Sequence, residues 1–513
     1  MKKKSYVSLA LCIAICTCIT HLKAQTDRTP TDKTQYSESR QLLLSQDQAG
    51  SLGADVRLSK EEQLLNQRLR QIQREKLNDY QANHFFPPAR YFYASRDHME
   101  QDELFRIFRR MPKGGVHHMH SIALGDVDWV IAEALKQENC YVYWGPTTPQ
   151  HPKGAMRFFR AGTAPAGYVK AQTLNKGIPN FQEQMREFLT LDMQTDADST
   201  DIWKEFEHYF GCVYNFVHYQ AIYKAYYEQA YRDLLEDGIQ HIEVRMSMLP
   251  LYSLDKPDGY YPVDSTMVYQ QQILESLQGE YPNFTLKLIY TNLRFLPAPV
   301  IQDDLIQAYE LRQRFPDLVE GYDLVAEEDA GRPTIEFLDI FLTIDSLNQA
   351  YGRDMPLFLH DGESNWVSNN NLIDAVLLGS KRIGHAFNLF RYPVLWDRIK
   401  SEGICLEICP LSNQILGYIR DLRNHPASLY LKLGLPISIS SDDPAPFDYT
   451  GVTPDYWAIF YAWELDLKHL KQLCKNALIY SALNDAAKQQ ALENWEKEWK
   501  AFVMWANAEL AGK

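Results

Sequence analysis

The chain has 513 residues, a formal net charge of −14 and 45% hydrophobic residues. This composition is typical of a folded globular protein and excludes a largely disordered one. Because acidic proteins repel phosphate backbones and anionic lipids, the charge disfavours nucleic acid and membrane surfaces as partners but leaves neutral small molecules open. The length fits two or three average domains or one elaborated α/β barrel.

The first 24 residues have the order of a secretory signal. Lys2 to Lys4 precede an apolar run over residues 6–20, and Ala24 marks the expected cleavage site. A membrane anchor is the alternative, but about 15 apolar residues are fewer than the roughly 20 that span a bilayer. No later stretch of the sequence predicts a membrane span. From the signal we expect an exported protein, either periplasmic or extracellular. Cleavage would remove four lysines and no acid, which takes the net charge from −14 to −18.

Two N-terminal segments precede the main domain. Residues 25–58 are polar and turn-rich without a sustained apolar period, which predicts a flexible leader. Ser59 and Glu62 then form a capping-box pattern, and apolar residues follow at helical spacing. We expect a helical extension over residues 59–110, either docked on another element or lying as an ordinary surface helix.

Eight strand-like runs alternate with amphipathic helical stretches over residues 111–513. This alternation implies parallel strands with right-handed crossovers, and eight units predict a closed (β/α)8 barrel of the TIM type; an open doubly wound sheet is the competing fold. A stretch at about 140–199 interrupts the rhythm after the first strand and predicts an inserted lobe. The expected strands cover residues 114–120, 241–246, 285–290, 321–325, 357–360, 382–387, 404–408 and 437–440.

Five cysteines remain once the predicted signal is removed, so at least one is not paired with another of them. Export permits a disulfide, and Cys140 with Cys212 is the pair we favour for a test. Cys405 and Cys409 lie in an apolar strand-like run with no second cysteine pair nearby. We interpret these two as buried core thiols and not as metal ligands.

Histidines and acids gather at the expected carboxyl ends of the strands. In the first strand His118 and His120 alternate onto one face, where two imidazoles can share one ion, whereas His117 points the other way and is interpreted as structural. Barrel active sites lie at these strand ends, so the pattern predicts a metal-dependent site. The other groups at strand ends are His360, Glu363, His385, Asp442 and Asp443.

These motifs resemble the adenosine deaminase family, and within it the secreted branch of adenosine deaminase-related growth factors. The similarity runs from about Glu61 to the C-terminus. It is carried by residues 86–120, HDGE at His360, RIGH at Arg382, CPLSNQ followed by DLRNHP, and ISSDDPAPF from Ile439. The resemblance implies zinc-dependent hydrolytic deamination of adenosine or 2′-deoxyadenosine to the inosine product and ammonia.

The resemblance also implies a metal centre with one zinc ion per subunit. Zinc lowers the pKa of a bound water to near neutrality and would so supply the hydroxide that attacks C6 of the purine. The implied ligands are His118, His120, His360 and Asp442.

Two catalytic residues and one base-binding residue follow from the same resemblance. His385 would accept a proton from the attacking water or stabilise the hydroxide. A protonated Glu363 would donate to N1, which requires a pKa raised by burial or by neighbouring charge. Asp443 would hydrogen-bond N7. The plainer alternatives are a helix cap before Pro444 for Asp443 and a surface acid for Glu363.

Another HxE pair, His241 with Glu243, is similar to the zinc motif of cytidine deaminases. That fold also needs a PCxxC segment, and the chain has none. We therefore interpret Glu243 and Arg245 as polar residues of the barrel interior.

Three substitutions relative to the family pattern touch the substrate side. Ser121 stands where the branch usually has an aspartate, Ala326 replaces a glycine in DLVAEED, and Ala386 replaces the last glycine of RIGHG. The resemblance implies that the Ala326 backbone N–H would face purine N3, with a methyl group that narrows the approach. It also implies a different recognition of ribose, because Ser121 cannot accept a hydroxyl as an anion does. Trp203 is either a pocket-wall or a core residue. Another aminopurine or a modified nucleoside therefore stays open as the substrate.

The resemblance also bears on assembly, because the N-terminal helical segment is a dimerisation region in this branch. It implies a homodimer. A non-catalytic extracellular binding protein of the same fold is the third hypothesis. It is disfavoured because no expected ligand or acid–base position is missing.

Overall fold

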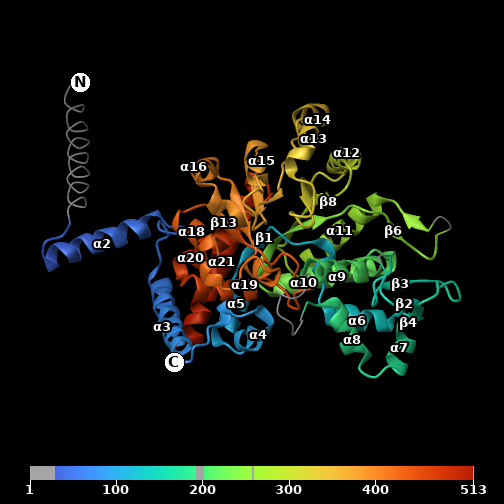
Figure 1. The fold of residues 1–513 in the computed structure, drawn as a ribbon, viewed down its shortest axis with the longest axis horizontal. Coiled ribbons are helices and arrows are strands. Elements are labelled where there is room, and N and C mark those ends of the chain that lie inside the picture. Colours follow the sequence, from blue (N-terminus) through green and yellow to red (C-terminus); the bar gives the residue numbers. More distant parts are fainter. Residues whose placement is uncertain (1–28, 149, 192–201, 257–258, 512–513) are drawn as a thin grey trace.

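Eight short parallel strands form the centre of the molecule, and helices surround them (Figure 1). The predicted signal, residues 1–24, lies outside the described part of the chain. The computed structural model describes residues 29–148, 150–191, 202–256 and 259–511.

The eight strands form two parallel arcs, ordered β1-β5-β8-β9 and β10-β11-β12-β13. Isolated β-bridges pair Tyr322 with Leu357 and Met119 with Asp442, so β9 meets β10 and β13 meets β1. The sheet is closed, which confirms the predicted barrel and excludes the open sheet. The strands are β1 (Gly114–Val116), β5 (Ile239–Met246), β8 (Thr285–Leu293), β9 (Val319–Val325), β10 (His360–Asp361), β11 (Arg382–His385), β12 (Cys405–Ile408) and β13 (Ile437–Ile439).

Strand β5 shows why this sheet needs cover on both faces. All of its residues are buried, as is typical of parallel strands between helices and a barrel interior. His241, Glu243 and Arg245 alternate with apolar residues, so they share one face of the strand. Arg245 contacts Asp323 of β9 and Glu407 of β12, which places this face in the barrel interior, as predicted.

The covering helices pack with a face on which buried residues recur at helical spacing. Tyr223, Tyr227 and Tyr231 of α10 are an example. No described helix is long and apolar enough to cross a bilayer. The helices are α6 (Val127–Lys136), α9 (Ile202–Val217), α10 (Gln220–Glu236), α11 (Val263–Gln278), α12 (Ala298–Arg314), α13 (Leu338–Phe341), α14 (Ile344–Tyr351), α15 (Asn371–Leu377), α16 (Pro393–Glu402), α17 (Pro410–Ile415), α18 (Ala427–Lys432), α19 (Thr453–Ala462), α20 (Leu467–Ile479) and α21 (Asp485–Glu509).

Short elements complete the loops between these helices and strands. A two-stranded hairpin follows β5, and single turns of 3-10 helix lie at several strand ends. They are β6 (Leu251–Tyr252), β7 (Tyr260–Tyr261), η1 (Pro87–Ala89), η2 (Ser121–Ala123), η4 (Thr334–Phe337), η5 (Phe387–Arg391) and η6 (Leu422–Asn424).

The N-terminal extension is helical and is docked on the barrel domain. It consists of α3 (Lys60–Ala82), α4 (Phe92–Glu100) and α5 (Glu103–Arg110). Helix α3 begins with the predicted capping box of Ser59 and Glu62. The Glu62 carboxylate also accepts hydrogen bonds from Trp499 Nε1 at 2.7 Å and from Lys471 Nζ at 2.6 Å. These bonds join the extension to α21 and α20.

The leader contains a helix that the sequence analysis did not predict. Residues 33–50 form α2 (Lys33–Gly50), which projects away from the barrel (Figure 1). The prediction for residues 25–58 was a flexible leader, and it did not include this helix. None of the residues of α2 is buried, so its apolar side chains form no packed face on the rest of the described chain. Its local signal is Asp32, whose side chain accepts the N–H groups of Thr34 and Gln35.

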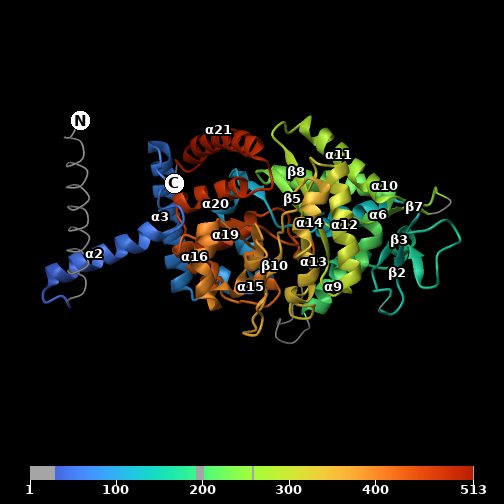
Figure 2. The same ribbon diagram turned by 90° about the horizontal axis from the view of Figure 1, so that it is seen from above.

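The predicted inserted lobe is present between the first two barrel strands. A three-stranded antiparallel sheet in the order β3-β2-β4 is followed by two helices. The lobe lies at the opposite end of the molecule from α2 in both views (Figures 1 and 2). Its elements are β2 (Cys140–Tyr143), β3 (Met156–Phe158), β4 (Tyr168–Lys170), α7 (Ala171–Gly177) and α8 (Phe181–Leu189).

All five cysteines in the described residues are free and buried. The suggested disulfide between Cys140 and Cys212 is therefore wrong. Cys140 packs in the core of the lobe, and Cys212 Sγ lies 3.5 Å from the carbonyl oxygen of Lys153. Both behave as small apolar side chains, as do Cys405 and Cys409, for which this was predicted.

Candidate metal centre and active site

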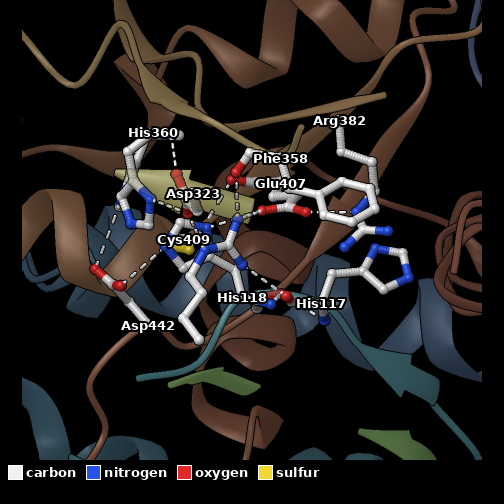
Figure 3. A network of polar contacts seen from close by, with 12 residues as sticks. His117, His118, Asp323, Phe358, His360, Arg382, Glu407, Cys409 and Asp442 are labelled. Carbon is white, nitrogen blue, oxygen red and sulfur yellow. Dashed lines mark hydrogen bonds and ion pairs between the residues drawn. The ribbon is translucent and has the colours of Figure 1, made fainter. Parts of the chain in front are cut away.

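The four predicted metal ligands converge at the carboxyl ends of the strands. Asp442 Oδ1 lies 3.2 Å from His118 Nε2 and 3.1 Å from His120 Nε2. His120 Nε2 lies 3.2 Å from His360 Nε2. His118 and His120 follow β1, His360 begins β10 and Asp442 follows β13. The closed barrel thus brings together residues more than 300 positions apart. Figure 3 shows His118, His360 and Asp442 pointing toward one another.

The convergence leaves donor atoms that suit a cation. His118 Nε2 and Asp442 Oδ1 are buried and make no hydrogen bond within the described residues. Buried polar atoms without a partner are rare, and here they face a shared point. Ligand atoms of His118, His360, His385 and Asp442 lie within 4.8 Å of one another, as do those of His120, Asp442 and Asp443. Imidazole nitrogens and a carboxylate oxygen are a suitable donor set for zinc.

Two buried acids orient the histidines. Glu407 Oε2 lies 3.0 Å from His118 Nδ1, and Asp323 Oδ2 lies 2.6 Å from His360 Nδ1. Each bond occupies Nδ1, so Nε2 is the nitrogen that is directed to the centre. Neither acid was predicted as a site residue from the sequence. The sequence signal that could have identified them is their position, because each is an acidic residue within a strand that is otherwise mostly apolar and buried.

Two arginines in the barrel interior compensate these acids. Arg245 donates to Asp323 Oδ2 at 2.6 Å and to Glu407 Oε2 at 2.5 Å, and Arg382 donates to Glu407 Oε1 at 2.5 Å (Figure 3). Burial pushes the pKa of Glu407 upward, but Arg245 and Arg382 hold this pKa well below its ordinary value. The acid is therefore a permanent acceptor for His118. His117 is buried outside this site, with contacts to Ser438 and Ala477, as expected of a structural histidine.

Glu363 has the environment required of a protonated acid. Burial, and next the charge of Asp442, raise the pKa of Glu363 well above its ordinary value. Its Oε1 makes no hydrogen bond in the described residues and lies 3.4 Å from His385 Nδ1. Burial lowers the pKa of His385 to about 3, which keeps this ring neutral. Neither residue is at the surface, so the surface-acid interpretation of Glu363 is wrong.

Asp443 is also buried and makes no cap. No described helix begins directly after Pro444, where the chain forms a turn, and this excludes the helix-cap interpretation. Asp443 Oδ1 has no hydrogen-bond partner in the described residues. Burial and the neighbouring Asp442 raise the pKa of Asp443 well above its ordinary value. A protonated Asp443 can donate to an acceptor in the cavity.

A cavity of about 280 Å³ opens beside these groups. Its wall contains all four residues predicted to bind substrate, namely Ser121, Trp203, Ala326 and Asp443. Trp203 of α9 is half-buried and belongs to the wall. The rest of the lining is largely apolar and includes Phe206, Phe210, Met248 and Leu249.

The family models match most of this architecture. The model for adenosine deaminase matches residues 172–498, and the model for the adenosine/AMP deaminase N-terminal region matches residues 11–108. The chain belongs to the adenosine deaminase family.

Two relatives align with nearly the whole length of this chain. Adenosine deaminase 2 of Sus scrofa is 31% identical over 492 residues, covering 92% of this chain and 94% of the relative. The adenosine deaminase of Lutzomyia longipalpis is 33% identical over 493 residues with the same coverage. These matches place the chain in the adenosine deaminase 2-like branch.

Solved structures share the fold of this adenosine deaminase family member at low identity. Adenine deaminase from Arthrobacter aurescens has a TM-score of 0.52 and 19% identity, covering 76% of this chain and 99% of its own. A zinc-bound amidohydrolase from Burkholderia ambifaria has a TM-score of 0.51 and 16% identity, covering 79% and 94%. These structures share the (β/α)8 barrel, and membership of the adenosine deaminase family makes the chain a metal-dependent aminohydrolase.

Two alanines of this adenosine deaminase family member occupy backbone positions that favour glycine. Ala326 has φ of +88° and Ala386 has φ of +46°, both in the left-handed region. Both alanines therefore hold a backbone conformation that is strained for a residue with a side chain. Ala326 lines the cavity directly, so its methyl group takes space on the substrate side, as predicted.

Proposed function

We propose that this protein catalyses the zinc-dependent hydrolytic deamination of adenosine and 2′-deoxyadenosine to inosine or 2′-deoxyinosine and ammonia. The observation that carries the proposal is the convergence of His118, His120, His360 and Asp442 beside a buried Glu363, whose pKa is raised by burial. Zinc is the ion we infer, because three imidazoles and one carboxylate suit it. When bound, it would act as a Lewis acid and make water nucleophilic at neutral pH.

The residues of the chain would bind and protonate the purine. Glu363 would donate its proton to N1, which weakens the ring conjugation as C6 becomes tetrahedral. Asp443 would donate to N7, an acceptor that suits a carboxyl group with a raised pKa. His385 would stand beside the attacking oxygen. The apolar wall would exclude water from these polar contacts.

The charges of the cavity favour a nucleoside over a nucleotide. Arg245 is the one arginine or lysine among the described lining residues, and its guanidinium is occupied by Asp323 and Glu407. Carboxyl groups, among them Glu207 and Asp304, line the wall elsewhere. A phosphate group would lose its hydration here without gaining a cation.

A second candidate is the deamination of another aminopurine or a modified nucleoside. The Ala326 methyl group in the cavity wall and the neutral Ser121 favour it, because both alter the side that would face purine N3 and the sugar. A non-catalytic binding protein is the weaker alternative, since each ligand and acid–base position is filled.

We also propose that the protein is a homodimer. Helix α2 exposes Tyr36 and Leu43, which are 61% and 58% accessible and lie two turns apart on the helix. An 18-residue helix that buries none of its residues is marginal in water, so contact with a second copy would stabilise it. Sedimentation of the wild type and of Leu43→Glu tests this, with a monomeric wild type as the contradicting result.

Export to the periplasm or the extracellular space is the remaining proposal. It is supported by the order of basic, apolar and small residues over positions 1–24. N-terminal sequencing of protein recovered outside the cytoplasm would be expected to begin at Gln25. Recovery of the uncleaved chain with the cytoplasmic fraction would contradict it.

The decisive experiment follows the ultraviolet absorbance of adenosine with zinc-loaded wild type and with His360→Ala. Loss of absorbance in the wild type alone supports the deaminase. If the wild type binds one zinc ion yet leaves adenosine unchanged, a panel of other aminopurine nucleosides decides for the second candidate.

A further inference from the structure

A buried chain of hydrogen bonds connects α18 to His385. It runs from the backbone N–H of Ala427 to His425 Nδ1 at 3.1 Å, from His425 Nε2 to Asn413 Oδ1 at 3.1 Å, and from Asn413 Nδ2 to His385 Nδ1 at 3.3 Å. The His425 and Asn413 side chains are fully buried, and that of His385 is 1% exposed. Water therefore does not compete for these bonds.

The first bond fixes the direction of all the others. A backbone N–H can only donate, so His425 Nδ1 must be an acceptor and must carry no proton. Burial lowers the pKa of His425 to about 3, so its ring is neutral and its single proton is on Nε2. This proton is donated to Asn413 Oδ1, which in turn fixes the orientation of the amide.

The amide nitrogen of Asn413 then faces His385. An NH2 group is a donor without acceptor capacity, so His385 Nδ1 must accept, and the N–H of the ring is then the one at Nε2. One neighbour agrees with this tautomer. Asp442 Oδ2 lies 3.8 Å from His385 Nε2 and is compatible with a proton there, whereas a lone pair would face the carboxylate.

We propose that Asn413 and His425 are positioning residues that hold the proton of His385 on Nε2, so that His385 acts as a hydrogen-bond donor and not as the general base. This inference rests on the proposed function, because the role of His385 in catalysis presupposes the deamination reaction. The sequence left two roles open for His385, namely acceptance of a proton from the attacking water and stabilisation of the hydroxide. A proton on Nε2 favours the second role, stabilisation of the oxygen that adds to C6.

The tautomer itself can be measured without substrate. The test uses zinc-loaded full-length protein labelled with ¹⁵N in histidine, with the His385 signals identified by their loss in His385→Gln. We expect an unprotonated Nδ1 and a protonated Nε2 in the wild type. We expect a mixture of tautomers in Asn413→Leu and His425→Phe, and the wild-type pattern in His425→Gln, whose amide nitrogen can replace Nε2 as donor. A proton on Nδ1 of His385 in the wild type would overturn the proposal.

Kinetics provide the second readout. In Asn413→Leu and His425→Phe, kcat should fall about 10- to 100-fold with KM and zinc content unchanged, the range typical of lost supporting hydrogen bonds, and His425→Gln should restore it. Asn365→Leu is the matched control, because Asn365 is exposed and outside the chain of bonds. An equal loss in this control, or a wild-type kcat in both disrupted variants, would overturn the positioning role. An inactive wild type would contradict the proposed function, whereas the ¹⁵N spectrum would still decide the tautomer.

Discussion

Glu328 holds the backbone of Glu363 in place. Its two carboxylate oxygens accept the N–H of Gly362 at 3.0 Å and the N–H of Glu363 at 2.6 Å. Gly362 has φ of +87°, so the turn after β10 uses a conformation that favours glycine. Glu363, the proposed proton donor to the purine, is thus fixed by a second acid from the β9 end of the barrel.

Glu328→Gln should therefore lower both stability and kcat. Glutamine keeps one acceptor oxygen, so a buried N–H of the turn loses its partner at a cost of about 1–3 kcal/mol. Displacement of Glu363 should lower kcat by roughly 10- to 100-fold. Urea denaturation and steady-state kinetics measure the two effects. Glu336→Gln, which removes an exposed acid, serves as the control. Unchanged kcat in Glu328→Gln would show that the turn keeps its position without this carboxylate.

Glu363→Gln should abolish most of the activity without loss of metal. The amide can still donate a hydrogen bond, but it cannot give up a proton, and acid catalysis of this kind contributes about 10²–10⁴-fold. The expected result is a fall of kcat in this range with wild-type zinc content by elemental analysis. Retention of the full kcat would remove Glu363 from its catalytic role.

Glu407→Gln should weaken zinc binding about 10- to 100-fold, because outer partners of metal ligands have effects of this size. The variant leaves His118 Nδ1 with a weaker partner and Arg245 with one carboxylate fewer. Zinc affinity is measured by competition with a chelator. Glu320→Gln is a matched control, because Glu320 also pairs with two cations but far from the site. Equal affinity in the wild type and Glu407→Gln would contradict the orienting role.

Ala326→Gly should stabilise the fold by about 1 kcal/mol, since a left-handed backbone is strained for alanine and not for glycine. It should also enlarge the cavity and lower KM for substrates that contact this wall. The denaturation midpoint and KM report the two effects. Ala375→Gly, within the buried face of α15, should have the opposite effect on stability, by roughly 1 kcal/mol or more. A destabilised Ala326→Gly would show that the methyl packing outweighs the strain.

Asp233 should make stability fall as pH rises through the mildly acidic range. Burial raises its pKa to about 6 from 3.8. The unfolded chain therefore loses this proton first, and the folded state is progressively disfavoured between about pH 4 and pH 6. Asp233→Asn should thus be more stable than the wild type above this window and similar below it. Melting temperatures on both sides of the window test this. Asp303→Asn, at an exposed position, controls for the general loss of negative charge.

The convergence of the proposed metal ligands was predictable from sequence, because the position of each residue along its strand is a local feature. His118 and His120 alternate along one strand, and His360 and Asp442 end others, so the strand pattern alone places them at one edge of a barrel. Closure of the barrel was also predictable, because eight strands that alternate with helices can form few other sheet topologies.

The supporting residues could not be found in this way. Glu407 and His118 are 289 positions apart, and their contact depends on how β12 and β1 face each other across the interior. Asn413 and His425 appeared only as letters of the CPLSNQ and DLRNHP motifs. Helix α2 was missed because it buries nothing, and the Cys140–Cys212 pairing failed because proximity in a fold cannot be read from spacing.

The positions of the ligands have a consequence for the barrel as a whole. The two arcs of strands meet at two seams, and each seam is joined by a single isolated bridge, Met119 to Asp442 at one and Tyr322 to Leu357 at the other. An ion held by His118 and Asp442 would span the first seam, and His360, hydrogen-bonded to Asp323 of β9, extends the same cluster to the second. The metal would therefore close the cylinder as well as serve the reaction, and its removal should increase backbone amide exchange first along these two seams.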